Sequence, residues 1–532
     1  MKEHIVRVYP SKNNLKKENQ LAWKLAECAL DSAASISNKV CDMVINRMID
    51  NAAVAIASLE RKSVQHARDQ AMVHPHPRGA LIFGCSNNQK FFANWCAWAN
   101  GTAVRELDFH DTFLAADYSH PADNIPPVLA AAQQKSCNGQ QLLKGIVAAY
   151  EIHIALVKAI CLHKHKIDHI AHLCPAQVAG TGALLSMDTN QLYQAINQAV
   201  HMSFNTRQSR KGAISSWKAY APAHAGKLAL EAVDRCLRGE RSPSPIYEGE
   251  DSVIAWMLDG PEAEYKVILP EKGEEKKAIL ESYTKEHSAE YQSQALIDLA
   301  FEMRKQIYRT GIEFANSELL SPLGRNLHKP QNSNKISIKN LESIKEITIY
   351  TSHHTHYVIG TGSGDPEKQD PKANRETLDH SITYIFAVAL EDGKWHHIHS
   401  YTPERAGRPE TIRLWHKIKT CEDKEWTTLY HHPDPSEKSF GGRVEIIFKD
   451  GTRITGEKKR ANAHPVGDKS FKRKDYIEKF MELSRFSPVE EKEKTRFLSL
   501  VQKLPELSSE EVSQLNVQAR IPLQKSSVGL LD

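Results

Sequence analysis

The chain has 532 residues, of which 41% are hydrophobic and 25% charged, and its net charge is +4. This length exceeds one compact core and predicts two or three domains, and the composition is that of a folded, soluble protein. The nearly balanced charge argues against a protein that coats nucleic acid, but it is compatible with a local cationic pocket for an acidic substrate.

The first residues, MKEHIVRVYPSKNN, lack the apolar core of a signal peptide. No stretch approaches roughly 18 uninterrupted apolar residues, so we expect a cytoplasmic protein with no membrane partner. The nine cysteines form no CxxC pair, the spacing with which structural zinc and iron–sulfur sites usually present two thiolates. We therefore expect buried core thiols.

Residues 15–265 carry a mainly helical pattern, with apolar residues at three- and four-residue spacing. Residues 139–162 predict one long helix, and Asn124 is placed to cap a helix that begins with a Pro-Pro pair. A further helix over 222–238 is expected to end at Gly239 in a left-handed cap. The many alanines of this part predict closely packed helices.

The pattern changes after about residue 270, where the charged segment 271–277 suggests a boundary. Residues 344–360 are rich in β-branched and aromatic side chains and predict a strand. Residues 381–390 predict a buried strand or a short helix, and the Asp450-Gly451 pair between alternating runs predicts a hairpin.

Residues 360–376, rich in Gly, Pro and Asp, are expected to form a long loop, and the helical pattern returns from Asp475 onward. The predicted fold class is mainly α with a second, α+β domain. The predicted parts are a helical domain over 1–270, an α+β domain over 271–470, and C-terminal helices over 471–532 that return to the helical domain.

The first dense group of reactive side chains lies in ELDFHDTFLAADYSHPADN. It contains Asp108, His110, Asp111, Thr112 and His120, directly before a predicted helix. Capping and turn formation explain some of these polar residues. Because the segment holds more carboxylates and imidazoles than capping requires, it is a candidate site.

A second group, CLHKHKIDHIAH, contains His163, His165, His169 and His172. The four-residue spacing of His165 and His169 would suit a metal, but histidines on an exposed helix end are commonly solvated. We prefer a neutral histidine that acts as a general acid or base, because its pKa lies near the working pH.

A third group, Arg207, Arg210, Lys211 and Lys218, precedes the helix predicted to begin near Pro222. A cationic loop at a helix N-terminus can bind an anion, although an ordinary basic surface loop explains the composition better.

In a fourth group, His354 and His356 would face one side of the predicted strand 344–360. No cysteine or acidic neighbour in the sequence completes a tetrahedral metal set. We therefore prefer either no special function or a hydrogen-bonding role for these histidines.

Several long segments occur in an order that resembles the MmgE/PrpD family of 2-methylcitrate dehydratases. They are ELDFHDTFLAADYSHPADNIPP, TRQSRKG with SSWK, TSHHTHYVIGTGSGDPEKQDP, RETLDHSITYIFAVAL and HSYTPERAGRP. The resemblance covers nearly the whole chain. It implies a large all-helical domain and a smaller α+β lid domain, with a site in the cleft between them that uses no cofactor, neither a metal ion nor an iron–sulfur cluster.

The resemblance also implies residue roles. The catalytic residues would be Asp108, His120, His169 and Tyr384. The substrate-binding residues would be Thr112, Arg207, Lys211, Lys218 and Lys285. His172 is an alternative to His169, either His120 or His169 could be the base, and Lys218 is preferred over Lys211. His110 stands where the family often has aspartate, which departs from the decarboxylase-like members.

The implied reaction is the elimination of water from 2-methylcitrate to give 2-methyl-cis-aconitate, a step of propionate catabolism in the methylcitrate cycle. Side activity on citrate or cis-aconitate stays open, as does the substrate stereoisomer. The alternatives are a cis-aconitate decarboxylase-like enzyme on the same fold and a non-catalytic tricarboxylate-binding protein. We expect a homodimer, with no nucleic-acid partner.

Overall fold

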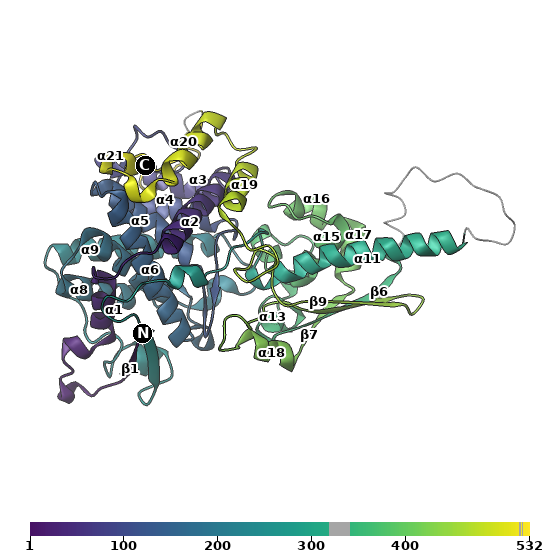
Figure 1. Ribbon diagram of the computed structural model, residues 1–532, viewed down its shortest axis with the longest axis horizontal. Coiled ribbons are helices and arrows are strands. Elements are labelled where there is room, and N and C mark those ends of the chain that lie inside the picture. Colours follow the sequence, from purple (N-terminus) through teal and green to yellow (C-terminus); the bar gives the residue numbers. More distant parts are fainter. Residues whose placement is uncertain (319–340, 521–522, 524) are drawn as a thin grey trace. The chain divides into compact units, whose positions relative to one another are not determined.

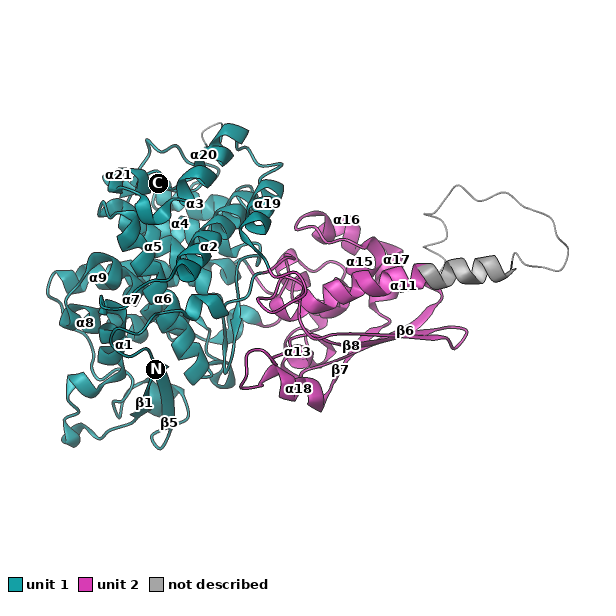
Figure 2. Cartoon of the chain, in the orientation of Figure 1, with its two compact units in different colours: residues 1–210, 216–284, 471–532 teal, residues 211–215, 285–470 magenta. Residues whose placement is uncertain are grey.

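The computed structural model describes residues 1–318, 341–520, 523 and 525–532, which form two compact units (Figures 1 and 2). Unit 1 consists of Met1–Arg210, Ser216–Thr284 and Phe471–Asp532, and unit 2 of Lys211–Ser215 and Lys285–Ser470. Both chain ends belong to unit 1. Unit 1 is helical apart from short strands and unit 2 mixes helices with a sheet, so the predicted fold class is confirmed.

The chain passes from unit 1 to unit 2 after Thr284, later than the charged segment near residue 270 suggested. The reason is that residues 271–284 are bonded to unit 1. Lys276 donates to the Asp31 carbonyl at 3.0 Å, and Glu151 accepts from the Ala278 amide at 2.9 Å. Arg47 donates to the Ser282 carbonyl at 2.8 Å.

The helices of unit 1 fall in two runs of the chain. Those before residue 284 are α1 Leu21–Leu30, α2 Asn38–Ala57, α3 Lys62–Met72, α4 Ala93–Arg105, α5 Ile125–Gln134, α6 Gly139–Ala159, α7 Ile170–Leu185, α8 Thr189–Ser203, α9 Trp217–Leu237 and α10 Val253–Met257. Those after residue 471 are α19 Arg473–Leu483, α20 Glu491–Val501 and α21 Ser509–Val512. The strands are β1 Lys2–Arg7, β2 Pro75–Ala80, β3 Phe113–Leu114, β4 Tyr118–Ser119 and β5 Glu264–Leu269. β1 pairs antiparallel with β5, and β3 with β4.

Small residues let the central helices of unit 1 approach closely. A Cβ atom added to Gly180 of α7 would lie 2.7 Å from the Gly145 carbonyl oxygen of α6 and 2.6 Å from the Ala149 Cβ. Any side chain at this position would therefore force the two helices apart. The close packing expected from the alanine-rich sequence is confirmed here.

Two helix ends test the sequence patterns. Gly239, at a φ of +94°, follows α9 as predicted. The start of α9 was predicted wrongly, because the helix begins at Trp217 and Pro222 lies inside it. Proline has no N–H, so the Lys218 carbonyl one turn earlier lacks its helical donor, and Arg210 supplies a hydrogen bond of 3.1 Å instead. Asn124 precedes α5 as expected, but its side chain donates to the Pro121 carbonyl and does not cap the helix.

Unit 2 contains a sheet in the order β7-β6-β8-β9. Its strands are β6 Ile344–Thr351, β7 Ile418–Glu422, β8 Gly442–Phe448 and β9 Arg453–Lys458. β6 pairs parallel with β7 and antiparallel with β8, and β8 and β9 form the predicted hairpin around Gly451. Its helices are α11 Gln294–Glu318, α13 His353–Val358, α14 Arg375–Leu378, α15 Ile382–Asp392, α16 Pro403–Ala406, α17 Pro409–Trp415 and α18 Lys424–Tyr430. Helix α11 packs against β9, α15 packs against β7, and the two helices pack against each other.

The strand predicted over 344–360 is too long. It ends at Thr351 because the Ser352 side chain accepts the Thr355 amide and caps α13, so His354 and His356 lie on a helix. The segment 381–390 is helical, as the second of the two predicted alternatives. Residues 360–374 form turns and short 3-10 segments, in agreement with the predicted loop, and helix α14 begins at Arg375.

Among the described residues, no helix combines the length and apolar character needed to cross a bilayer. All nine cysteines are free thiols. Six are buried and the other three half-buried, so most of them are core residues as expected.

Helix α19 packs on α2 of the same unit and carries the buried Lys479. Its ammonium lies 2.7 Å from Asp50 Oδ1 and donates to the Phe109 carbonyl at 2.7 Å.

Removing one partner of a buried ion pair leaves the other charge uncompensated, so Lys479→Met should lower the free energy of unfolding by about 3–5 kcal/mol. Urea denaturation would measure the loss. The double variant with Asp50→Asn should recover part of it, and a single variant as stable as the wild type would contradict the prediction.

Candidate functional site

The densest group of buried reactive side chains predicted from the sequence lies in unit 1. Three segments contribute to it: the loop 106–124 after α4, the segment 160–169 before α7, and the turn 207–210 with the first turn of α9. Asp108, His169 and Lys218 are each 1% exposed. Charged groups this deeply buried require partners, and those partners define the site.

Arg105, the last residue of α4, bridges Asp108 and His120. Its guanidinium donates to Asp108 Oδ1 and, at 3.0 Å, to His120 Nε2. Because a guanidinium can donate but not accept, His120 Nε2 is the acceptor and the ring proton is assigned to Nδ1. Nδ1 then donates to the Asp111 carbonyl at 2.9 Å, with Thr112 Oγ1 at 3.1 Å. His120 is therefore neutral and held at both ring nitrogens.

Asp108 occupies an unusual position. Its φ is +49°, in the left-handed region that non-glycine residues rarely adopt and that aspartate tolerates better than most. Its second oxygen, Oδ2, lies 3.4 Å from Lys218 Nζ. Backbone strain of this kind is frequent at functional positions, where surrounding contacts maintain it.

His169 has a parallel arrangement. Arg210 donates to His169 Nε2 at 3.1 Å and, through Nε, to Asp168 Oδ2 at 3.3 Å. Burial lowers the pKa of His169 to about 3, so the ring is neutral at ordinary pH. Burial by itself would raise the pKa of Asp168, but Arg210, His169 and Ser209 outweigh it and hold that pKa below its usual value. His169 Nδ1 is buried and has no hydrogen-bond partner.

A buried charge pair supports the loop that carries His120. Asp111 lies 3.4 Å from Arg47 Nε and accepts hydrogen bonds from the Tyr150 hydroxyl at 2.9 Å and the Ala122 amide at 2.8 Å. Burial raises the pKa of Asp111, and Arg47 opposes this rise. These contacts fix the backbone whose carbonyl orients the His120 ring.

Two further residues of the predicted groups border this site. His110 Nε2 lies 2.8 Å from Asp123 Oδ1, and its ring stacks on His120 with 5.2 Å between centroids. Arg207, which is half-buried, donates from Nε to the Tyr118 hydroxyl at 2.9 Å. The Tyr118 ring centroid lies 5.8 Å from that of His169.

Of the predicted site residues, unit 1 thus brings together Asp108, Thr112, His120, His169, Arg207 and Lys218. The other three belong to unit 2. Lys211 donates to the Ser363 carbonyl at 2.7 Å and pairs with Asp365. Lys285 is fully buried. Tyr384 lies in the core of unit 2, where its ring meets Trp415 and its hydroxyl donates to the Ser400 carbonyl at 2.5 Å.

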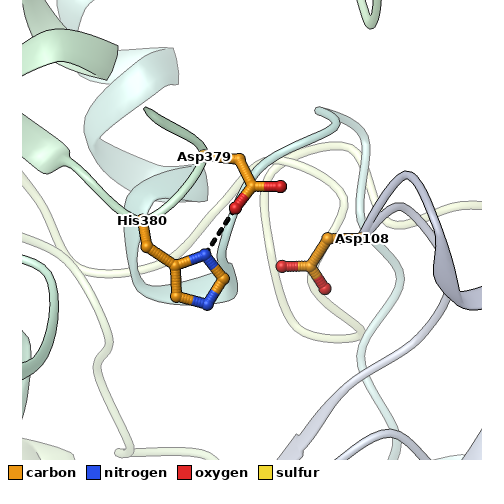
Figure 3. A group of neighbouring side chains, drawn as sticks. All are labelled: Asp108, Asp379 and His380. Atoms are coloured by element: carbon orange, nitrogen blue, oxygen red, sulfur yellow. Dashed lines mark hydrogen bonds and ion pairs between the residues drawn. The ribbon is translucent and has the colours of Figure 1, made fainter. Parts of the chain in front are cut away.

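Next to Tyr384 in the sequence, unit 2 holds an acid–histidine pair that sequence reasoning did not single out. His380 Nδ1 is hydrogen-bonded to Asp379 Oδ1 (Figure 3). Arg375 donates to Asp379 Oδ2 at 3.0 Å. Figure 3 also draws Asp108, which belongs to unit 1.

Glu286, His287 and Asp298 of unit 2 could offer ligand atoms to a metal, since these atoms lie within 4.8 Å of one another. Both Asp298 oxygens are already hydrogen-bonded, to His287 Nε2 at 2.9 Å and to the Asn462 amide at 2.8 Å. Hydrogen bonding therefore explains this group without an ion.

The remaining predicted histidines divide by environment. His163 and His165 are half-buried, whereas His169 and His172 are fully buried, so the expectation of one exposed helix end was wrong for the second pair. On α13, His353 Nδ1 pairs with Glu422 at 3.0 Å and His356 Nδ1 lies 2.6 Å from Thr420 Oγ1. For His356, the hydrogen-bonding role expected of the fourth group is confirmed.

Sequence reasoning missed Arg105 and the part played by Arg210 with Asp168. A usable signal was present. Arg105 is the one cation in the stretch Ala93–Arg105, and it directly precedes the acidic start of the loop 106–124. A lone cation at the end of a largely buried helix needs a carboxylate partner, and Asp108 is three residues away.

Family models match most of the chain. The MmgE/PrpD N-terminal domain matches residues 19–266, and the MmgE/PrpD C-terminal domain matches residues 287–504. The chain belongs to the MmgE/PrpD family. The resemblance inferred from the sequence motifs is confirmed.

Relatives in this family carry the name 2-methylcitrate dehydratase. A mitochondrial one from Yarrowia lipolytica is 25% identical over 66% of this chain and 62% of its own length. A probable one from Saccharomyces cerevisiae is 25% identical over 72% and 69%, and one from Salmonella typhimurium is 26% identical over 75% and 77%. The match to the Yarrowia protein therefore covers less than two thirds of that relative.

His172 lies outside the cluster, and its burial predicts how the stability of the protein depends on pH. Its Nε2 donates to the Ile160 carbonyl at 3.0 Å, and burial lowers its pKa to about 4. An unfolded chain has a histidine pKa of about 6.5, so between these values the unfolded state binds a proton that the folded state does not. Stability should consequently fall as the pH drops through this window.

His172→Gln should flatten this pH dependence, because it removes the titrating group. Melting temperatures of unit 1 between pH 4 and 6.5 would measure the slope, with His201→Gln, on an exposed residue of α8, as the matched control. An unchanged slope in His172→Gln would contradict the assignment.

Proposed function

We propose that this protein is a hydro-lyase that eliminates water from 2-methylcitrate to give 2-methyl-cis-aconitate in propionate catabolism. The observation that carries the proposal is the buried cluster of unit 1, in which two neutral imidazoles, two carboxylates and several cations are hydrogen-bonded. Such a cluster can bind a multiply charged anion and move a proton. The names of the relatives support the substrate.

A tricarboxylate needs cationic partners for its three carboxylates. Lys218, Arg105 and Arg207 of unit 1 are our candidates. Arginine and lysine form strong, charge-assisted hydrogen bonds to carboxylates, and arginine can bind both oxygens at once. A cation beside the carboxylate next to the reacting C–H also stabilises the negative charge that develops as the proton leaves.

The proposed base is His120, acting through Nε2. That nitrogen accepts a hydrogen bond from Arg105 in the free protein. The proposal therefore requires Arg105 to transfer this hydrogen bond to a substrate carboxylate, so that substrate binding itself releases the base. The Asp111 carbonyl keeps the ring oriented during this exchange.

Once His120 takes the proton, the C–H electron pair forms the double bond and the hydroxyl leaves as water after receiving a proton. Among the cations of the cluster, a lysine can give up its proton whereas arginine stays charged. We therefore propose Lys218 as this acid. Tyr384 and Lys211 are left out of the chemical step, because in unit 2 each is bonded to a neighbouring carbonyl oxygen.

The reaction can be tested by the absorbance of the conjugated alkene formed from 2-methylcitrate, with citrate measured in parallel and EDTA present. We expect a fast rise with 2-methylcitrate that the chelator does not reduce. Release of carbon dioxide from cis-aconitate would favour the decarboxylase alternative, and no turnover of any tricarboxylate would favour a binding protein. A cytoplasmic location and a homodimer are predictions from the sequence.

His120→Gln should lower kcat by about 10²–10⁴-fold, the usual contribution of a general base, while the protein stays folded. Circular dichroism would verify the fold, and His66→Gln, on an exposed histidine of α3, is the matched control. A folded His120→Gln protein that keeps its wild-type rate would refute the assignment of the base.

The two lysines of the basic segment can be separated by mutation. Lys218→Met removes a buried cation beside Asp108 and should reduce kcat/KM by at least about 10²-fold, as expected for a preorganised charge. Lys211→Met removes a partner of Asp365 and should reduce kcat/KM by a clearly smaller factor. The reverse order in steady-state kinetics would give Lys211 the substrate contact.

A further inference from the structure

Arg210 is fixed by three groups of unit 1. It donates through Nε to Asp168, through one terminal nitrogen to the Lys218 carbonyl, and through the other to His169 Nε2. The Lys218 carbonyl is available because Pro222, one turn later in α9, has no N–H to offer. Arg210 is itself buried, so these contacts hold its guanidinium in one place.

This anchoring decides which nitrogen of His169 carries the proton. Nε2 accepts from Arg210, so the neutral ring is protonated at Nδ1. Nδ1 is buried and has no hydrogen-bond partner in the free protein. A buried N–H without an acceptor is unfavourable, and an oxygen atom of a ligand would satisfy it.

Building on the proposed function, we propose that His169 binds the tricarboxylate as a hydrogen-bond donor through Nδ1–H, toward a carboxylate or hydroxyl oxygen. In this proposal Arg210 and Asp168 are positioning residues that hold His169 in the required tautomer.

The two histidines therefore have different roles. His169 is not the base, because its one acceptor nitrogen is occupied by an arginine with two other anchors. It is not a general acid either, because transfer of the Nδ1 proton would leave an imidazolate anion. A neutral imidazole can nevertheless stabilise negative charge on a substrate oxygen by a preorganised hydrogen bond, with no proton transferred.

Asp168 provides the alternative state. Its Oδ1 lies 3.8 Å from His169 Nε2. Without the Arg210 guanidinium, that carboxylate would favour a proton on Nε2, and Nδ1 would become an acceptor. Arg210 thus keeps His169 in the tautomer protonated at Nδ1, whereas Asp168 alone would favour the tautomer protonated at Nε2.

Amide substitutions can imitate each nitrogen separately. His169→Asn places an amide nitrogen where Nδ1 lies, whereas His169→Gln places one near Nε2. We expect His169→Asn to keep at least about ten-fold more kcat with 2-methylcitrate than His169→Gln, consistent with the loss of one preorganised donor. Equal rates, or a faster His169→Gln, would overturn the donor role.

The role of Arg210 is tested without turnover. Nitrogen-15 spectra of histidine-labelled protein report which ring nitrogen is protonated, and the spectrum of His169→Asn identifies the His169 signals. We expect a proton on Nδ1 in the wild type and in Arg210→Lys, which keeps a cationic donor, and a change to Nε2 in Arg210→Met. The control is Arg235→Met, whose arginine binds Gln198 at 2.8 Å elsewhere in unit 1. An unchanged tautomer in Arg210→Met would overturn the positioning role.

Calorimetric binding of tricarballylate, a tricarboxylate that cannot be dehydrated, tests the donor role of His169 separately from the proposed function. The donor role predicts weaker binding to His169→Gln than to His169→Asn. Wild-type protein that neither binds tricarballylate nor dehydrates 2-methylcitrate would overturn the proposed function and the ligand named here. Wild-type activity combined with indifference to both His169 variants would overturn the inference alone.

Discussion

A guanidinium group can donate hydrogen bonds but cannot accept one, and the site in unit 1 depends on this asymmetry. Arg105 and Arg210 each join a carboxylate to an imidazole, so each ring nitrogen that faces an arginine must be an acceptor. Both histidines are therefore neutral and have defined tautomers. The same arginines compensate the charges of Asp108 and Asp168, which would be costly to bury alone.

Irregular backbone positions these arginines where regular helices could not. The loop after α4 places Asp108 at a positive φ, which turns its carboxylate back toward the end of the helix that carries Arg105. Pro222 leaves a carbonyl of α9 without its helical donor, and Arg210 binds there. The site thus uses two local departures from ideal geometry, supported by the buried Arg47–Asp111 pair and the close packing of α6 on α7.

The sequence predicted the members of the site better than their arrangement. Asp108, His120 and His169 were identified by the density of reactive residues and by the family motifs, and unit 1 does bring them together. Arg105 was missed because it ends an otherwise apolar helix, where periodicity describes burial but not pairing. The tautomers were equally out of reach, since they depend on distances between segments far apart in the chain.

The fold likewise was predicted well in some elements and wrongly in others. Helix α6, with strong apolar periodicity, begins at Gly139 as predicted and ends at Ala159, three residues before the predicted end. The Asp450-Gly451 hairpin followed from its turn chemistry. The strand over 344–360 was overextended because its β-branched composition continues past Ser352, whose side chain caps a helix. A single capping hydrogen bond outweighed composition there, as it can wherever a strand and a helix meet.

His110 shows why family membership leaves the reaction to be measured on this protein. Its Nε2 lies 2.8 Å from Asp123 Oδ1, and its ring stacks on that of His120. A carboxylate at that position would add negative charge beside the ring of His120 and would favour its protonated form. An imidazole adds no such charge, so replacing His110 with aspartate would change the electric field at the proposed base. Because that field affects how readily His120 takes and releases a proton, the residue at position 110 influences the rate of the proposed reaction.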